Sequence, residues 1–551
     1  KGNGSEYVTE ENQHDAFGNI KTKTLTVPGL PQRISKYEYS PAAPYFGRFL
    51  TKSYIVDGGE NKMQRQFTYD GVSGNLLTES DDYSNTITHE YDKWHKLKKT
   101  IEFPGKTSTI TYSKPDLWSS LVTIEGNDGS SVMASYDDMG RKIVEGIKQI
   151  NDTWSYVKTE YDIYDRVIAV SEPYTSLTTA PSKWNTTTYD SYGRPKTTIT
   201  YGGKTTNISY VGLKTTINDG LKTTVTTRNA MGNVMLMTEG TSTVAYKYFA
   251  NGTLNESDYD GVKTKITQDG WGRRKTLEES SAGNYEYDYN GFGDLTREKT
   301  PNGETRYTLG PWGEVLEKTV KGSGSIATNT KSTYIYEANT KQITRLEFDD
   351  LANNLEINYN FGYDNYKRLN FRDETGYMSY YQQAVTYDDY GRALRELYTV
   401  AISPVVRSDK WVLNTYKNGH PYQIIDEALN NKVLWQTNTV NERGQLTAGL
   451  MGNGMRISRT YDQYGFPTQI KYFKSFTGRP VPPNVDYLTL GYNFNPSTEN
   501  LMSRTNSSFN FNETFKYDHL DRLTEHTNAR GLQELQSYDN RGRTTRNPLG
   551  S

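Results

Sequence analysis

A short motif recurs along the whole chain, and this repeat constrains the fold more than any other feature of the sequence. The motif reads Tyr-Asp-x-x-Gly-Arg, and successive copies or degenerate copies start at residues 228, 248, 268, 289 and 309. The spacing is therefore 20 or 21 residues there, and it lengthens to 24–31 residues elsewhere. A period of about 22 residues gives roughly 25 units. We predict one continuous repeat array over residues 1–551 and no separate domains.

The strongest copies supply the positions that we assign to the repeat. They are Tyr69, Asp70 and Gly74; Tyr136, Asp137, Gly140 and Arg141; Tyr189, Asp190, Gly193 and Arg194; Tyr387, Asp388, Gly391 and Arg392; Tyr461, Asp462 and Gly465; and Tyr538, Asp539, Gly542 and Arg543. The Tyr is expected to lie on a strand and stack on the Tyr one unit away. The Asp is expected to accept backbone N–H bonds in an Asx-type turn. The Gly supplies positive φ, and the Arg can pair with a neighbouring Asp.

A second turn signal lies about halfway through each period. Asp219-Gly220, Asp260-Gly261 and Asn302-Gly303 are dipeptides that reach positive φ easily, as hairpin turns require. The stretches between turns, such as Lys222–Thr227, alternate and are rich in Thr, Val, Ile and Tyr. Each unit is therefore predicted to be one β-hairpin.

The number of hairpins limits the architecture. Roughly 50 strands at about 4.8 Å each would make a flat sheet about 240 Å long. Open sheets twist and rarely stay open beyond about ten strands, so this sheet must coil or close on itself. We predict an all-β fold: a spiralling sheet of about 25 tandem β-hairpins, which is a β-solenoid in the broad sense.

Composition agrees with a folded chain built on tyrosine. Only 34% of residues are hydrophobic, but there are 45 Tyr, whereas disordered chains are poor in aromatic residues. The formal net charge of −2 gives no long-range field for nucleic acid, and no apolar run is long enough for a membrane-spanning helix. The chain has no Cys, which excludes disulfides and thiolate chemistry.

A search for catalytic or metal-binding residues leads to the prediction that the chain is not an enzyme and binds no cofactor. None of the six His forms a His-x-x-x-His pair, and no phosphate-binding glycine motif or serine nucleophile elbow is present. Three patterns allow a functional interpretation besides a structural one: His519 with His526 as metal ligands, the adjacent carboxylates Asp81-Asp82 and Asp349-Asp350 as a catalytic pair, and the basic run from Lys93 to Lys99 as a nucleic-acid site. The repeated Asp also allows calcium coordination as an alternative. In each case a structural role in the repeat is the preferred interpretation.

The Tyr-Asp-x-x-Gly-Arg unit at this spacing resembles the YD-repeat, or RHS-repeat, family. The copies at 69, 136, 189, 387, 461 and 538 carry the resemblance, and degenerate units extend it over essentially the whole chain. The family includes bacterial RHS and wall-associated polymorphic toxins, insecticidal toxin-complex subunits and teneurins. The resemblance implies a spiralling sheet wrapped into a hollow shell that encloses a C-terminal toxin or effector domain.

The resemblance also implies partners and a location. The expected partners are the chain's own effector domain or neighbouring shell segments, with secretion machinery in addition. The expected location is secreted or at the bacterial cell surface. Toxin members end their repeats in a core with an Asp-Pro cleavage motif, and Asn547-Pro548 matches it only superficially, so we predict no autoprotease, core or effector in this piece. The alternative function is a cell-surface module that binds glycan or a protein receptor through exposed Tyr and loops.

Longer repeat steps are expected to mark enlarged hairpins. The candidates are Ser171–Trp184, Lys321–Ser332, Val400–Trp411 and the proline-rich segment Gly478–Asn484. Protruding loops of this kind are where a binding function would be placed.

Overall fold

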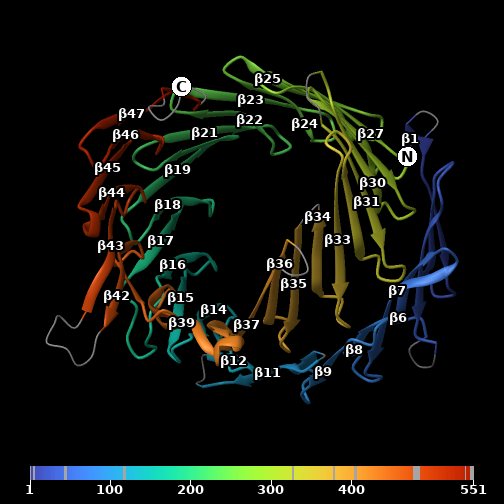
Figure 1. Ribbon diagram of the computed structural model, residues 1–551, viewed down its shortest axis with the longest axis horizontal. Coiled ribbons are helices and arrows are strands. Elements are labelled where there is room, and N and C mark those ends of the chain that lie inside the picture. The colour runs from blue at the N-terminus through green and yellow to red at the C-terminus, as the bar shows by residue number, and fades with distance from the viewer. Residues whose placement is uncertain are drawn as a thin grey trace. The chain divides into compact units, whose positions relative to one another are not determined.

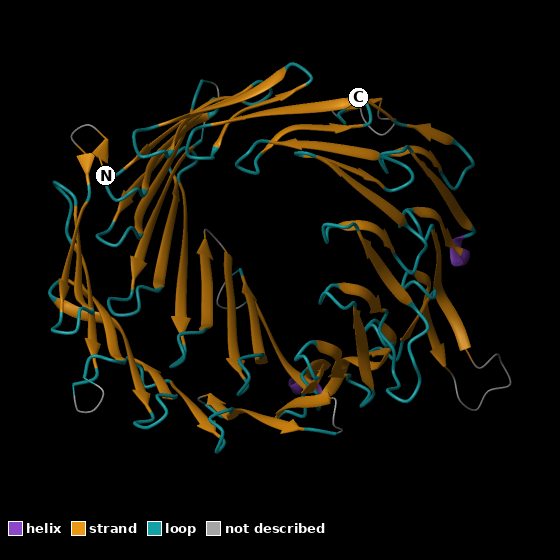
Figure 2. Ribbon diagram, turned by 180° about the vertical axis from the view of Figure 1, so that it is seen from behind, coloured by secondary structure: helices purple, strands orange, loops and turns teal. Residues whose placement is uncertain are grey.

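The computed structural model describes residues 2–3, 6–41, 46–102, 104–115, 119–324, 328–376, 379–402, 406–475, 484–539 and 542–546. The described residues are almost entirely β-strand and turn, with two short 3-10 helices, as Figure 2 shows. Strands β3–β47 form a single antiparallel sheet of 45 strands among these residues (Figure 1). The all-β prediction of tandem antiparallel strands is confirmed.

Contacts divide the chain into two compact units, each built from two stretches of sequence. Unit 1 comprises Lys1–Thr109 and Lys263–Leu413, and unit 2 comprises Ile110–Val262 and Asn414–Ser551. The boundaries fall inside strands β11 (Lys106–Ser113), β25 (Val262–Gln268) and β37 (Arg407–Lys417). They do not coincide with linkers. The single array over residues 1–551 stays a prediction.

The first stretch of unit 1 contains ten strands before β11. They are β1 (Gly2–Asn3), β2 (Glu6–Tyr7), β3 (Thr9–His14), β4 (Ile20–Thr26), β5 (Arg33–Tyr39), β6 (Leu50–Asp57), β7 (Glu60–Tyr69), β8 (Leu76–Asp81), β9 (Thr86–Tyr91) and β10 (Leu97–Glu102). The second stretch contains β26 (Arg274–Glu279), β27 (Gly283–Tyr289), β28 (Leu295–Thr300), β29 (Gly303–Leu309), β30 (Val315–Gly322), β31 (Asn329–Tyr336), β32 (Ile343–Asp350), β33 (Leu355–Tyr363), β34 (Leu369–Gly376), β35 (Ser379–Tyr387) and β36 (Ala393–Ala401).

The first stretch of unit 2 continues the same alternation. It contains β12 (Ser119–Gly126), β13 (Ser131–Asp137), β14 (Lys142–Lys148), β15 (Trp154–Tyr161), β16 (Val167–Ser171), β17 (Trp184–Tyr189), β18 (Pro195–Ile199), β19 (Thr205–Val211), β20 (Lys214–Asn218), β21 (Thr223–Arg228), β22 (Val234–Glu239), β23 (Ser242–Tyr248) and β24 (Leu254–Tyr259). The second stretch contains β38 (His420–Asp426), η1 (Glu427–Leu429), β39 (Lys432–Val440), β40 (Leu446–Met451), β41 (Arg456–Tyr461), β42 (Pro467–Ser475), β43 (Asn484–Phe494), β44 (Leu501–Asn506), η2 (Ser507–Phe509), β45 (Phe511–Tyr517), β46 (Leu523–Thr527), β47 (Gln533–Leu535), β48 (Ser537–Tyr538) and β49 (Thr544–Arg546).

Each repeat folds as a hairpin whose Tyr ends the incoming strand. In the pair β17 and β18, Thr188 lies opposite Thr197, but Tyr189 lies opposite Pro195, so the register shifts by one residue at the Tyr. The same irregularity occurs at the Tyr of most other units, including Tyr387 and Tyr461. A type I turn closed by a left-handed residue produces this bulge. The motif therefore sets the turn and the strand register together.

The sheet carries little apolar core of the usual kind. Six hydrophobic side chains are buried among the described residues: Val27, Ile150, Ala169, Leu397, Ala401 and Ile457. Most strand residues are half-buried, as expected when neighbouring strands of the same layer provide most of the covering. Stability must therefore depend on contacts that repeat from one hairpin to the next.

In the described part of the chain, the enlarged hairpins occur at the positions that the sequence predicts. Residues 172–183 connect β16 to β17, and Tyr174 of this loop forms a bridge with Tyr156. The segments at 321–332 and 400–411 also connect consecutive strands, although residues 325–327 and 403–405 lie outside the described part. The proline-rich segment Gly478–Asn484 lies outside it too, except for the backbone of Asn484.

Candidate functional site: contacts between repeats

The Tyr-Asp turn, meaning the turn formed by the motif, is closed by its Asp. In the unit at 189, Oδ1 of Asp190 accepts the backbone N–H of Tyr192 at 2.9 Å and that of Arg194 at 2.9 Å. Nε of Arg194 donates to Oδ2 of Asp190 at 2.8 Å. Gly193 has φ +79°, and its N–H donates to the Asp190 carbonyl oxygen at 3.0 Å. The carboxylate thus holds the backbone and the Arg of its own turn.

The same carboxylate–guanidinium pair recurs four residues apart in the other turns that contain Arg. The pairs are Asp137–Arg141, Asp162–Arg166, Asp269–Arg273, Asp364–Arg368, Asp388–Arg392, Asp518–Arg522 and Asp539–Arg543. At Asp190 the backbone N–H of Arg194 contributes most to lowering the pKa, burial opposes this, and the guanidinium adds to the lowering. At Asp162 the Arg166 guanidinium is the largest cause of the lowered pKa.

Two strong copies of the motif lack the Arg, and their Asp still closes the turn. Asp70 accepts the N–H of Val72 at 3.1 Å and both the N–H and hydroxyl of Ser73 at 2.7 Å. Asp462 accepts the N–H of Tyr464 at 2.9 Å and that of Phe466 at 3.0 Å. The carboxylate closes the turn in either case, so the Arg must have a further role.

The Tyr and the Arg connect successive units. The hydroxyl of Tyr189 donates to the carbonyl oxygen of Val167 in the preceding hairpin at 2.6 Å. The guanidinium of Arg166, the residue before Val167, lies 4.5 Å from the centroid of the Tyr189 ring. One unit therefore supplies an Arg that covers the ring and a carbonyl that receives the hydroxyl of the next Tyr.

This connection repeats along both units. Hydroxyl-to-carbonyl bonds join Tyr161 to Lys142, Tyr210 to Pro195, Tyr336 to Val315, Tyr363 to Ile343, Tyr387 to Leu369, Tyr461 to Leu446, Tyr517 to Leu501 and Tyr538 to Leu523. Arg lies over the next Tyr in the pairs Arg141–Tyr161, Arg194–Tyr210, Arg273–Tyr289, Arg368–Tyr387 and Arg522–Tyr538. Of the Tyr that these Arg cover, none has its described ring stacked on another Tyr, so the expected Tyr–Tyr ladder is wrong at these positions.

The remaining strong copies place their Tyr at the same strand end. Tyr69 packs against Phe49 with ring centroids 4.7 Å apart. Tyr136 ends the pairing of β13 with β14, and its side chain lines an apolar groove with Val132 and Ile147. Gly74, Gly140, Gly391, Gly465 and Gly542 all have φ between +76° and +94°.

In unit 1 a second kind of contact joins hairpins that are far apart in the sequence. Mid-repeat turns of the first stretch lie against Tyr-Asp turns of the second. Nζ of Lys367 donates to Asp82 at 2.7 Å, Lys341 pairs with Asp57, and Arg33 pairs with Asp294 at 2.6 Å. Burial lowers the pKa of Lys367, but Asp82 and Asp81 raise it by more, so the ammonium stays charged.

In unit 2 the same two kinds of turn meet. Arg443 pairs with Glu172 at 2.7 Å, with both side chains mostly buried. Tyr201 packs against Tyr464 with ring centroids 5.3 Å apart and donates its hydroxyl to Gln463 at 3.0 Å. Figure 1 shows β16–β19 beside β42 and β43 within this unit. Hydrogen bonds of this kind in both units join residues between 261 and 295 positions apart.

No local motif in the sequence identifies these partners. The one usable signal is the residue two positions after the motif Asp, which is aromatic in many turns and enters the contact in Tyr390 and Tyr464. The Oδ1 atom of Asn418 lies close to Gly129, and its Nδ2 donates to the Gln149 carbonyl oxygen at 2.8 Å. Such side-chain-to-turn contacts depend on the coiling of the sheet, so a pattern search along the chain does not find them.

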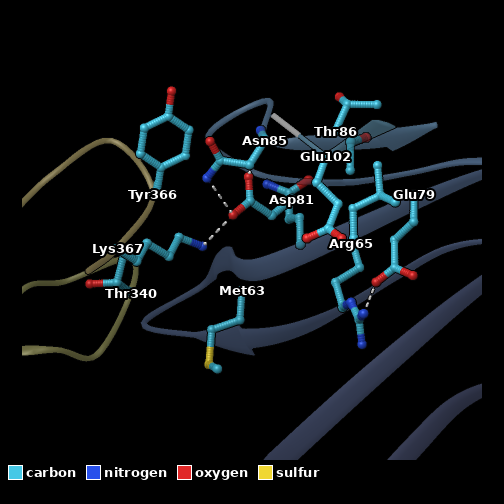
Figure 3. A pocket seen from close by; sticks show the side chains of 13 residues that line it. Met63, Arg65, Glu79, Asp81, Asn85, Thr86, Glu102, Thr340, Tyr366 and Lys367 are labelled. Carbon is cyan, nitrogen blue, oxygen red and sulfur yellow. Dashed lines mark hydrogen bonds and ion pairs between the residues drawn. The ribbon is translucent and has the colours of Figure 1, made fainter. Parts of the chain in front are cut away.

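A cavity of about 490 Å³ lies beside the unit 1 contact, between β7–β10 and the turns carrying Thr340 and Lys367 (Figure 3). Each of its charged groups has an ion-pair partner, and Glu102 pairs with Lys106 outside the lining at 2.6 Å. Asp81 lies 3.3 Å from Lys367 and accepts Nδ2 of Asn85 at 3.0 Å, and Arg65 pairs with Glu79. Burial raises the pKa of Asp81, but its hydrogen bonds lower it by more. An ionised, fully paired set of this kind does not resemble a general acid–base pair.

The other candidates from the sequence occupy repeat positions. Asp81-Asp82 and Asp349-Asp350 lie at strand ends and turns, and Lys93–His95 forms a turn before β10. His526 does not meet His519; it lies between Glu513 at 2.9 Å and Glu534 at 3.3 Å. Among the described residues no group of three His, Asp or Glu is arranged to hold a metal ion. Within the described part of the chain, no helix is both long and apolar enough to cross a membrane.

Comparisons with known proteins add solved structures of the same fold. No protein-family model matches the chain, and no curated protein matches it. The crystal structure of TcdB2-TccC3-TEV superposes on 98% of this chain with a TM-score of 0.76 at 12% identity. TcdB2-TccC3 without its hypervariable C-terminal region matches 99% with a TM-score of 0.67 at 13% identity, and TcdB2-TccC3 matches 98% with 0.66 at 14%. The chain spans 36%, 37% and 35% of those chains, about a third of their length. The chain thus has the fold found in the TcdB2-TccC3 structures.

Proposed function

We propose that the chain is a structural scaffold, part of the wall of an RHS-type secreted protein that encloses a toxin or effector segment. The observation that carries this proposal is that the sheet has two sets of contacts, one between successive hairpins and one between turns far apart in the sequence. Tyr–Arg links join many hairpins to the next one, and turn-to-turn contacts join stretches of sheet between 261 and 295 residues apart. A sheet stabilised in both directions is suited to exclude other proteins from one of its faces.

Three further observations support a role that is mechanical and not enzymatic. The charged groups in the cavity of unit 1 are paired, the repeated Asp are used in turns, and the fold is that of the TcdB2-TccC3 chains. Partners would be an effector segment, neighbouring wall segments and secretion machinery. The location would be secreted or at the cell surface.

The test measures whether the chain protects a fused peptide from digestion by a protease. An unfolded, protease-sensitive peptide is fused after Ser551, and its digestion is compared with that of the same peptide free in solution mixed with the unfused chain. The proposal predicts that digestion of the fused peptide is slowed roughly tenfold or more, while the mixed peptide is digested at its free rate. Equal digestion of the fused and free peptides would contradict enclosure by this part of the wall.

A further inference from the structure

One row of Tyr-Asp turns in unit 2 presents large side chains to solvent. The residue two positions after the motif Asp or Asn is Met139, Tyr164, Tyr192 or Met231 in four turns of the first stretch, with exposed fractions of 62%, 70%, 82% and 69%. We call these four residues the open turn row. Isolated exposed apolar residues are ordinary, but exposure of a large side chain at the same motif position in four turns of one stretch suggests an interaction surface.

The same turn position is covered in the second stretch of unit 2. Tyr464 packs on Tyr201, Arg443 pairs with Glu172 and keeps 20% of its side chain exposed, and Leu520 is half-buried. The covering groups come from mid-repeat turns of the first stretch. The structure therefore defines what this turn position binds when it is occupied: the mid-repeat turns of another stretch of the same kind of sheet.

Unit 2 also has uncovered mid-repeat turns that could fill this role. They belong to its second stretch, where Leu429, Phe509 and Leu532 are exposed by 55%, 75% and 59%. We call these three residues the open mid-repeat row. The chain thus carries both halves of a contact that it already makes internally, and each half is exposed.

We infer that a second copy of this chain docks on the open turn row through its open mid-repeat row. The contact continues the established one between the two stretches of unit 2 and uses the same two kinds of turn. Because it joins two different surfaces, it is heterologous and can propagate from copy to copy. This inference does not depend on the proposed enclosing function.

The test is sedimentation velocity of the full chain over a dilution series. The wild type is expected to sediment as dimers and longer species at high concentration and as monomers on dilution. The variant Tyr164→Ser/Tyr192→Ser is expected to weaken the association roughly tenfold per side chain, as for exposed aromatic residues at an interface centre. Phe509→Ser, in the open mid-repeat row, is expected to weaken the association through the other of the two docking surfaces. Met235→Ser, on the face of β22, is the matched control and should associate like the wild type.

Mixing the two defective variants separates docking from unspecific aggregation. The Tyr164→Ser/Tyr192→Ser chain keeps its open mid-repeat row, and the Phe509→Ser chain keeps its open turn row. At a concentration where the wild type associates, each variant alone should be mostly monomeric, and the mixture should form a heterodimer. A monomeric wild type at every concentration would overturn the inference, as would association that both variants leave unchanged. Glycan binding by a monomeric wild type that is lost in Tyr164→Ser/Tyr192→Ser would also overturn it and assign the row to sugar. Unchanged circular dichroism and thermal midpoints verify that the variants are folded.

Discussion

The guanidinium of Arg166 lies 4.5 Å from the ring centroid of Tyr189, and the carbonyl of the next residue, Val167, accepts the Tyr189 hydroxyl at 2.6 Å. The two contacts bind both the face and the end of one side chain to the preceding hairpin. Because this arrangement recurs along the sheet, it explains how a chain with a mean hydropathy of −0.81 folds without a large apolar core.

Removing the Tyr189 hydroxyl should destabilise the sheet. Tyr189→Phe leaves the carbonyl of Val167 without this donor, and one such hydrogen bond contributes about 1 kcal/mol to the free energy of unfolding. The midpoint of urea unfolding is expected to fall accordingly. Tyr192→Phe is the matched control, since this ring is 82% exposed and no contact of its hydroxyl is described. Equal midpoints for the two variants would show that the Tyr189 hydrogen bond contributes nothing.

The Arg contributes through its shape as well as its charge. Arg166→Lys keeps the positive charge but loses the planar group that binds Asp162 through two nitrogens and covers Tyr189. The free energy of unfolding should fall by about 1 kcal/mol. Lys516→Ala, which breaks a pair with the Lys side chain 64% exposed, should change it by less. If Arg166→Lys lowers the free energy of unfolding no more than Lys516→Ala does, the contact between the guanidinium and the Tyr189 ring is not stabilising.

Acid should weaken the turns. The folded-state pKa of Asp162 and Asp190 lies below the unfolded value of about 3.9, so their contribution to stability is complete above about pH 5. It is lost as the pH falls below about 4 and the carboxylates take up protons. Urea midpoints measured across this range should drop, and Asp162→Asn should reduce the drop. Asp138 is an exposed turn residue without a described partner, so Asp138→Asn should leave the drop in the urea midpoint unchanged. If Asp138→Asn and Asp162→Asn change the drop equally, the carboxylate that closes the turn has no role in it.

The fifth motif position tests backbone strain. Gly140 has φ +78°, and a Cβ built there meets no atom within 4 Å. Gly140→Ala should therefore lower the free energy of unfolding by about 1–2 kcal/mol through the left-handed conformation alone. Gly140→Asn should lower it less, because Asn tolerates this conformation. An Ala variant as stable as the wild type would mean that the turn adopts another conformation.

The sequence predicted the hairpins and the turn positions because these depend on residues within six positions of one another, such as Asp190 and Arg194. The partner of the Tyr was predicted incorrectly: the ring of Tyr189 lies against Arg166 of the preceding hairpin and not against another Tyr. The pairs Arg443–Glu172 and Lys367–Asp82 could not be predicted, since they depend on how tightly the sheet coils over more than 260 residues. The exposure of the open turn row could not be predicted either, because its residues occupy the same motif position as residues that are covered in the second stretch.

The measurement that tests the account most directly is a charge exchange at the contact between the two stretches of unit 2. Glu172→Arg places two cations together, so it should loosen the contact and restore rapid digestion of a peptide fused after Ser551. The double variant Glu172→Arg/Arg443→Glu re-forms the pair and should recover protection. Glu145→Lys, at the pair with Lys142 in which both side chains are about half exposed, should leave protection intact. Protection that survives Glu172→Arg, or that the double variant does not recover, would contradict the claim that turn-to-turn contacts close the wall.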